Sequence, residues 1–336
     1  RLLIARTAKG WTSALSQLKD QKMAPKVLIS DKLSPAAVQI FKDRGIDVDF
    51  QPDLGKDKEQ LAKVINNYDG LAIRSATKVT ETILREADNL KVIGRAGMLY
   101  RDLIPDRLGG SIIASHISIP KGGPVPDMVH YHTIGFQLIF CKRGWVKLVY
   151  EDQGPPFILR AGDCVTQPPE IRHRVLESSD NLEVIEIGVP AEHMTTIDHE
   201  LELPTKTYRP DRLFQGQRFC HHQLKDAVWE DWRVAGFRFR ESGIHSATQG
   251  DAAVHIIKPI QAIQETPVIS HTTDILFSFM LSGNMILNAE GQETQPLTGG
   301  DAFVIPPDMK YQFTHISEDL ELLEVALPGS FETIVH

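Results

Sequence analysis

The stretch "VHYHTIGFQLIFCKRGWV", residues 129–146, combines a metal-binding pattern with a strand pattern. His130 and His132 are separated by one residue, and on a β-strand such residues share a face. The spacing therefore indicates two imidazoles that could hold one metal ion. Gln137 stands where many such sites carry a carboxylate, and Gly144 ends the apolar run that follows.

The chain repeats this region at an offset near 139 residues. Residues 161–175, "AGDCVTQPPEIRHRV", match residues 299–313, "GGDAFVIPPDMKYQF". The shared Gly–Asp favours a turn, and the shared Pro–Pro favours an extended edge that cannot donate to a ladder. Matching single positions are Arg101 and Arg240, His116 and His255, His132 and His271, and Gly144 and Gly283. Two copies of one unit predict two similar barrels made by duplication.

From about Met98 onward, short β-rich runs punctuated by Gly and Pro replace helical periodicity. The runs "WVKLVY" and "LEVIEIGVP" are typical of this half of the chain. Such a pattern predicts an all-β barrel or sandwich.

These motifs resemble those of the cupin family, here in a two-barrel form. The first cupin motif reads H-x-H, four residues, Glu, six residues, Gly, and the second reads Gly, five residues, Pro, with His five further on. This chain matches with His130, His132, Gln137 and Gly144, and then with Gly162, Pro168 and His173. Gln in place of Glu is the one departure. The resemblance implies that His130, His132, Gln137 and His173 surround one divalent transition metal, either Fe, Mn, Ni or Zn.

In the second copy the same four positions read Ile269, His271, Leu276 and Tyr311. One imidazole with a phenol and two aliphatic groups is not a donor set for a divalent metal. We therefore expect the second barrel to keep the fold with a degenerate site.

The role of Gln137 has two interpretations. As a ligand, its neutral oxygen would leave the ion its full charge and favour anionic oxygen compounds. Alternatively, it points inward and hydrogen-bonds only a bound water or substrate.

Two further residues are candidate catalytic groups, Glu170 and His116. Glu170 lies between the Pro–Pro pair and His173, where a carboxylate could move a proton, although loop acids are commonly only solvated. His116 is retained as His255 in the copy that lost its metal set, which favours a structural role over a substrate contact. Cys141 and Cys164 lie in apolar strands and are expected to be packing residues.

Residues 23–97 have a different pattern, in which short strands alternate with helices of about ten residues. The segments "IRSATKVT" and "LKVIGRAG" resemble the N-terminus of the D-3-phosphoglycerate dehydrogenase family. The resemblance implies the first part of a substrate lid, with Arg74 and Ser75 near an anionic substrate. It stops after about 75 residues, and the chain has no G-x-G-x-x-G that opens a helix. We therefore expect no active NAD-dependent dehydrogenase, and no cofactor-binding residue is assigned.

Composition narrows the function class. A formal net charge of −8 argues against nucleic acid or an acidic membrane as partner. Three cysteines without CxxC spacing favour a reduced compartment, so a cytoplasmic location is expected. Residues 1–22 are expected to be a disordered leader, with a transit peptide as the alternative because no acid precedes Asp20.

The resulting prediction is a mainly β protein of tandem cupin (double-stranded β-helix, or jelly-roll) barrels with a short N-terminal α/β segment. The barrels are expected at residues 98–200, with the metal, and 201–336. The expected function is a dioxygenase-type or isomerase-type reaction on a small oxygen-rich or anionic metabolite. The alternative is a non-catalytic module that binds or senses such a molecule, and a homodimer is left open. Cupins include enzymes and non-enzymes, so the fold does not choose between them.

Overall fold

The computed structural model describes residues 3–5, 24–32, 35–73, 77–95, 98–104, 106–125 and 127–336. Contacts divide the chain into two units. One comprises residues 8–101 and 117–121, and the other comprises residues 1–7, 102–116 and 122–336. Arg74 and Ser75 lie outside the described residues.

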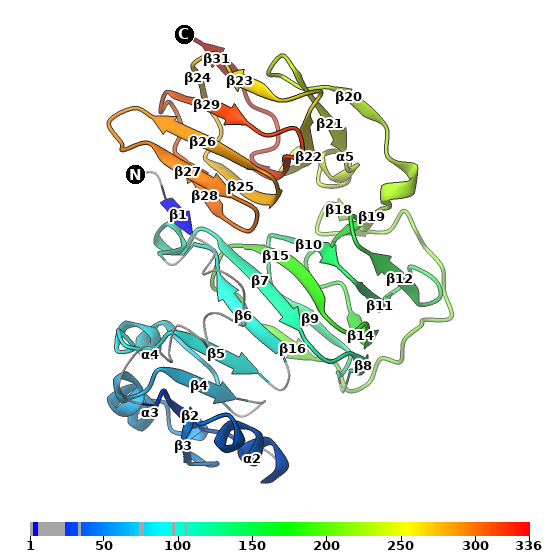
Figure 1. The fold of residues 1–336 in the computed structure, drawn as a ribbon. Helices are drawn as coiled ribbons and strands as arrows, with labels where there is room; N and C mark the ends of the chain where they lie inside the picture. Colours follow the sequence, from blue (N-terminus) through cyan, green and yellow to red (C-terminus); the bar gives the residue numbers. More distant parts are fainter. Residues whose placement is uncertain are drawn as a thin grey trace. The chain divides into compact units, whose positions relative to one another are not determined.

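The smaller unit is an α/β sheet with helices between its strands (Figure 1). Strands β2 and β4 pair in parallel, as do β2 with β3 and β4 with β5, while β6 pairs antiparallel with β5. Leu28, Leu61 and Leu71 are buried in its core. The parallel order is the one predicted from the alternating strands and helices. The elements are β2 (Lys26–Ile29), α2 (Pro35–Asp43), β3 (Asp47–Phe50), α3 (Lys58–Val64), β4 (Gly70–Ile73), α4 (Glu81–Arg85), β5 (Val92–Arg95) and β6 (Met98–Asp102).

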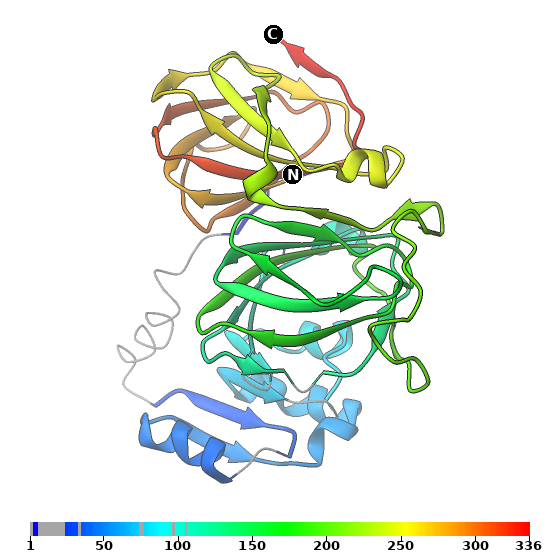
Figure 2. The ribbon, with the colours of Figure 1, turned by 90° about the vertical axis from the view of Figure 1, so that its right-hand side faces the viewer.

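The larger unit contains the two barrels, and each is made of two sheets (Figure 2). In the first barrel, one sheet runs β19-β13-β10-β15-β7 and the other runs β12-β11-β14-β9-β16. Its strands are β7 (Ile113–Ile119), β8 (Gly123–Pro124), β9 (His130–His132), β10 (Phe136–Arg143), β11 (Trp145–Tyr150), β12 (Phe157–Arg160), β13 (Cys164–Thr166), β14 (His173–Ser178), β15 (Leu182–Val189), β16 (Thr195–Ile197) and β19 (Cys220–His222). This arrangement is the predicted cupin barrel.

The second barrel has the same topology, with sheets β1-β28-β25-β30-β22-β21-β20 and β27-β26-β29-β24-β31. Its strands are β20 (Trp229–Asp231), β21 (Phe237–Glu241), β22 (Ala253–Pro259), β23 (Ile263–Glu265), β24 (Ile269–His271), β25 (Ile275–Ser282), β26 (Asn284–Ala289), β27 (Gln295–Thr298), β28 (Ala302–Ile305), β29 (Tyr311–Ile316), β30 (Glu321–Leu327) and β31 (Thr333–Val335), with the one-turn helix α5 (Ile244–Ala247). Tandem barrels are thus the observed fold.

The repeated glycines make the same turn in both barrels. Gly144 follows β10 with φ +77°, and Gly283 follows β25 with φ +73°. A Cβ on Gly144 would lie 2.3 Å from the Ser179 Oγ, and one on Gly283 would lie 2.5 Å from the Leu320 Cα. Both positions therefore require glycine, because the backbone is in the left-handed region and a nearby segment of the same chain leaves no room for a Cβ atom.

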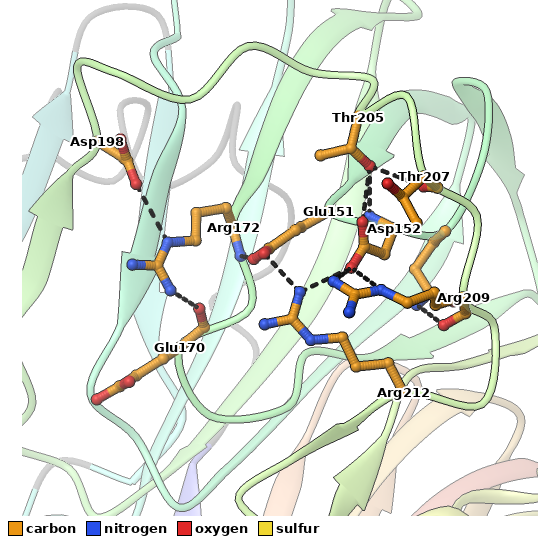
Figure 3. Close-up of polar contacts among 10 residues, drawn as sticks. Glu151, Asp152, Glu170, Arg172, Asp198, Thr205, Thr207, Arg209 and Arg212 are labelled. Atoms are coloured by element: carbon orange, nitrogen blue, oxygen red, sulfur yellow. Dashed lines mark hydrogen bonds and ion pairs between the residues drawn. The ribbon is translucent and has the colours of Figure 1, made fainter.

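The segment that leaves the first barrel remains attached to it beyond the expected boundary at residue 200. Strand β19 pairs with β13, and Arg209 and Arg212 both donate to the buried carboxylate of Asp152 in the turn that follows β11 (Figure 3). These two guanidiniums oppose the effect of burial and hold the pKa of Asp152 below its ordinary value. The charged network therefore anchors the connecting segment to β11.

The expected leader contains one described strand, β1 (Leu3–Ala5), which pairs antiparallel with β28. β1 takes the same edge of the second barrel that β19 takes in the first, beside the strand after the Gly–Asp turn. Apart from β1, the expected leader lies outside the described residues. Among the helices that the structure describes, none has the length and hydropathy needed to cross a membrane.

Candidate metal centre

Strands β9 and β14 bring three predicted ligands together. His130 pairs directly with His173, and His132 is two residues along β9 on the same face. Nitrogen atoms of the three imidazoles, one from each ring, all lie within 4.8 Å of one another. The ring centroids are 4.3 Å apart for His130 and His173, and 5.2 Å apart for each pair that includes His132. Among the described residues, this is the one group of His, Cys, Asp or Glu with metal-ligand spacing.

Each of these imidazoles has its Nδ1 occupied by another group. Nδ1 of His130 donates to the Met128 carbonyl oxygen at 2.8 Å, and Nδ1 of His173 donates to the Ile171 carbonyl oxygen at 3.0 Å. Nδ1 of His132 lies 2.9 Å from the Thr195 Oγ1. A carbonyl oxygen only accepts, so the proton of a neutral His130 or His173 is fixed on Nδ1 and Nε2 keeps its lone pair. This arrangement is the one that metal-ligating histidines adopt.

The surroundings of His132 and His173 favour the neutral form of these two imidazoles. Burial, together with the neighbouring His130 and His193, lowers the pKa of His132 to about 3. Burial, followed by the charges of His130 and His132, also lowers the pKa of His173 well below its ordinary value. Neutral imidazole is the form that binds a transition metal, so the donor set fits such an ion.

The fourth predicted ligand, Gln137, lies on β10 and is 2% exposed. Its Nε2 donates to the Glu186 Oε1 at 2.7 Å. Its Oε1 is buried and has no hydrogen-bond partner among the described residues. Gln137 pairs with Gly188 on β15, which places Glu186 two residues along on the same face. Whether Gln137 ligates a metal stays a prediction, but its amide has an oxygen to offer.

The sequence analysis missed three residues around the triad: Glu186, His193 and Thr195. Burial raises the pKa of Glu186, although the hydrogen bond from Gln137 opposes this. The His193 ring lies 5.5 Å from that of His132 in an edge-to-face arrangement. Thr195 holds the Nδ1 of His132. The repeat retains Glu186 as Glu324 and Thr195 as Thr333, but the repeat by itself does not show that either residue faces the triad.

In the second barrel an arginine contacts the residues aligned with this centre. Glu324 on β30 corresponds to Glu186, because Ser278–Glu324 and Ile139–Glu186 are matching pairs in the two barrels. Arg233 makes two hydrogen bonds of 2.6 Å to the Glu324 carboxylate. It also lies within hydrogen-bonding reach of Tyr311, which corresponds to His173.

This guanidinium is covered by aromatic rings. It lies 4.2 Å from the Trp232 ring centroid and 5.0 Å from that of Phe331. His271, the retained histidine, bonds through Nε2 to the Ile305 carbonyl oxygen at 3.1 Å. The second barrel thus holds a fixed side-chain cation among the residues that match the metal-binding set.

Glu170, a predicted acid or base, follows the Pro–Pro pair with φ +62°. Its backbone N–H donates to the His132 carbonyl oxygen at 3.0 Å, and its own carbonyl oxygen accepts from Arg172. In Figure 3 no hydrogen bond or ion pair joins its carboxylate to the other residues drawn, while Arg172 donates a hydrogen bond to Asp198. The loop is therefore fixed beside the triad through its backbone, and the catalytic role of Glu170 stays a prediction.

His116, the other predicted catalytic residue, has contacts of a structural kind. Its Nε2 lies 2.9 Å from the Glu183 Oε2, and its ring packs edge-on against Phe279 of the second barrel. Its counterpart His255 lies 3.7 Å from the Glu324 Oε1. These contacts favour the structural interpretation, and a substrate contact stays a prediction. Cys141 and Cys164 are buried as expected.

Known proteins of two different kinds match the chain, one kind at the α/β segment and the other at the barrels. Residues 27–100 match the family model described as D-isomer specific 2-hydroxyacid dehydrogenase, catalytic domain. D-3-phosphoglycerate dehydrogenase of Homo sapiens is 44% identical over 72 residues, which is 21% of this chain and 13% of that protein. The enzyme of Methanocaldococcus jannaschii is 40% identical over 73 residues, covering 22% of this chain and 13% of its own length. The chain therefore spans about 13% of these relatives.

The solved structures that it resembles are two-barrel cupins. Oxalate decarboxylase from Bacillus subtilis superposes with a TM-score of 0.52 at 12% identity, covering 71% of this chain and 73% of that one. The Lactobacillus farciminis oxalate decarboxylase formate complex gives 0.52 at 14% identity, with coverage of 71% and 83%. Vicilin from Capsicum annuum gives 0.51 at 12%, also with coverage of 71% and 83%. At such identities the likeness shows the fold alone.

Proposed function

We propose that the first barrel binds one divalent transition metal through His130, His132 and His173, and acts on a small anionic oxygen compound held there. The observation that supports this most strongly is that the Nδ1 atom of each of the three histidines is engaged by a hydrogen bond. Each imidazole is oriented by a hydrogen bond on Nδ1, and the free edges of the rings converge within ligand distance. This convergence of three oriented imidazoles, one of them buried, is what a metal site requires.

The protein groups favour an anionic ligand over a cationic one. All three histidines are neutral donors, and Gln137 would add a neutral oxygen, so the charge of a bound ion is not reduced by its ligands. Such an ion supplies Lewis-acid chemistry and attracts carboxylates or enolates. We propose a dioxygenase-type or isomerase-type reaction, with Glu170 as a candidate acid or base. The structural likeness to oxalate decarboxylase is compatible with a small carboxylate as substrate and is not evidence for that reaction.

Elemental analysis of protein purified without chelator tests the metal. We expect one equivalent of a first-row transition metal per chain. The double variant His130→Ala/His132→Ala should lose it, and the matched control His271→Ala in the second barrel should retain it. Two equivalents per chain, or none after reconstitution, would contradict the proposal.

A second measurement separates an enzyme from a binding module. The metal-loaded protein would be incubated with a panel of small hydroxy, keto and dicarboxylic acids while oxygen uptake and product formation are followed. A dioxygenase consumes oxygen with its substrate, and an isomerase converts its substrate without oxygen. Saturable binding without turnover of any bound acid would favour the non-catalytic alternative.

A further inference from the structure

The segment that connects β15 to β16 and the first residue of β16 each place one side chain beside His132. Thr195 bonds the Nδ1 of His132, and His193 places its ring against the ring of His132. A Cβ built on Gly188 would lie 3.6 Å from the His193 Cε1. Because Gly188 pairs with Gln137, His193 borders the triad on the side of Gln137.

His193 lies outside the set of converging ligands, because none of its atoms belongs to the group of nitrogens that lie within 4.8 Å of one another. Its ring is partly exposed, as are those of His130 and His132, whereas His173 is buried. His193 Nδ1 lies 3.4 Å from the Pro190 carbonyl oxygen, which turns the Nε2 edge away from that backbone. The residue therefore stands next to the metal-binding set without belonging to it.

The second barrel shows what packing alone requires at this position. Residues 190–197, "PAEHMTTI", align with residues 328–335, "PGSFETIV", because Thr195 pairs with His132 as Thr333 pairs with His271. His193 corresponds to Phe331, which lies over the Arg233 guanidinium. The fold therefore accepts an apolar ring here.

The internal comparison sorts the polar residues into two groups. The positions of His130, Gln137, His173 and His193 have become Ile269, Leu276, Tyr311 and Phe331. The positions of His132, Glu186 and Thr195 have kept their residue type as His271, Glu324 and Thr333. An imidazole at position 193 thus accompanies the complete metal-binding set and is lost with it. His116 shows the opposite pattern, because it is retained as His255 in the barrel that lacks the metal-binding set.

We propose that His193 is a ligand-recognition residue of the first barrel, which hydrogen-bonds an oxygen of a small carboxylate or hydroxycarboxylate bound at the metal on the Gln137 side. This inference rests on the proposed metal function. His193 would contact the bound compound and leave metal affinity to the triad. Its partial exposure fits a position where a ligand enters from solvent.

The test measures metal and ligand affinity separately on the full chain. Cobalt(II) binding would be followed by visible absorption, and glycolate would then be titrated into the cobalt-loaded protein. The variant His193→Phe installs the residue of the second barrel, so it should fold. His193→Gln keeps a polar side chain, and His199→Phe repeats the substitution at an exposed histidine.

We expect His193→Phe to bind cobalt within about twofold of the parent and to bind glycolate at least tenfold more weakly, since one charge-assisted hydrogen bond is lost. His193→Gln should recover part of the glycolate affinity, and His199→Phe should match the parent. Unchanged glycolate affinity in His193→Phe would overturn the inference. The inference would also be overturned if His193→Phe lost cobalt as completely as the double variant His130→Ala/His132→Ala, because His193 would then be a metal ligand. A parent that binds no cobalt would instead overturn the proposed metal function, and this inference with it.

Discussion

Gln137 and Glu186 form one hydrogen-bonded pair across β10 and β15, with the amide Nε2 2.7 Å from the carboxylate Oε1. The site therefore does contain a carboxylate, although the motif position holds an amide. The pair also fixes the amide, because its Nε2 donates to Glu186 and the Gln137 oxygen is therefore turned away from that carboxyl group. Variants of this pair therefore test how a carboxylate near the three histidines affects the binding of metal and of an anion.

Gln137→Glu should tighten metal retention and weaken binding of a carboxylate such as glycolate by about tenfold or more. Two unit charges 4 Å apart interact by about 4 kcal/mol at an effective dielectric near 20, and about 1.4 kcal/mol is a factor of ten. Gln137→Leu, which removes the donor and adds no charge, should mainly loosen the metal. Metal and glycolate titrations of both variants check this.

The exchange Gln137→Glu/Glu186→Gln is the matched control, because it moves the carboxylate from β15 to β10 at constant total charge. If its glycolate affinity returns towards that of the parent, net charge decides anion binding. Parent-like metal and glycolate binding in every variant would show that Gln137 is only a packing residue.

Thr195→Val should reduce metal affinity by about 10-fold to 100-fold, the usual effect of removing the group that orients a ligating histidine. The hydroxyl of Thr195 holds the Nδ1 of His132, and valine keeps the shape without the oxygen. Thr196→Val on the same strand is the control and should bind as the parent does. Equal metal dissociation constants for the two variants would contradict this role.

Arg233→Met should destabilise the second barrel by about 3–5 kcal/mol, because it leaves the buried Glu324 carboxylate uncompensated. The double variant Arg233→Met/Glu324→Leu should recover much of that loss. Arg238→Met, at an exposed guanidinium 3.9 Å from Asp231, should change stability by less than about 1 kcal/mol. Urea unfolding measures the stability of all three variants. An Arg233→Met variant as stable as the parent would show that the Arg233–Glu324 pair does not stabilise the fold.

The stability contributed by Glu183 should depend on pH. Hydrogen bonds from His116 and Lys142, against burial, lower the pKa of Glu183 from 4.5 to about 2. A carboxylate with a lowered pKa stabilises the fold above its unfolded value, and this contribution is lost as the pH falls from about 4.5 towards 2. Glu183→Gln should therefore cost more stability near pH 7 than near pH 3. A cost that is equal at both pH values, measured by urea unfolding, would contradict this.

We expect no saturable binding of NAD at micromolar concentration by this chain. The family model matches residues 27–100, the human D-3-phosphoglycerate dehydrogenase matches over 72 residues, and the chain carries no G-x-G-x-x-G opening a helix. Calorimetric titration of the chain with NAD measures this binding directly. A dissociation constant in the micromolar range would require a nucleotide site that the sequence does not indicate.

The sequence by itself determined the tandem barrels, the parallel order of the α/β segment and the three histidines. The strands and the α/β order follow from short-range alternation, and the two barrels follow from the repeat at an offset near 139 residues. His130 and His132 follow from an H-x-H whose members share a face, whereas His173 is assigned by the resemblance to the cupin motifs. It also indicated that the second copy had lost its donor set, because the substituted residues stand at motif positions.

The tertiary structure alone decided which other residues belong to the site. Glu186, His193 and Thr195 lie on β15, β16 and the segment between them, 49 or more positions along the chain from their partners Gln137 and His132. Arg233 is 91 residues from Glu324. No local pattern marks such residues, because the register between strands distant in sequence is set when the barrel closes, and only that pairing brings an amide to a carboxylate or a guanidinium to an acid.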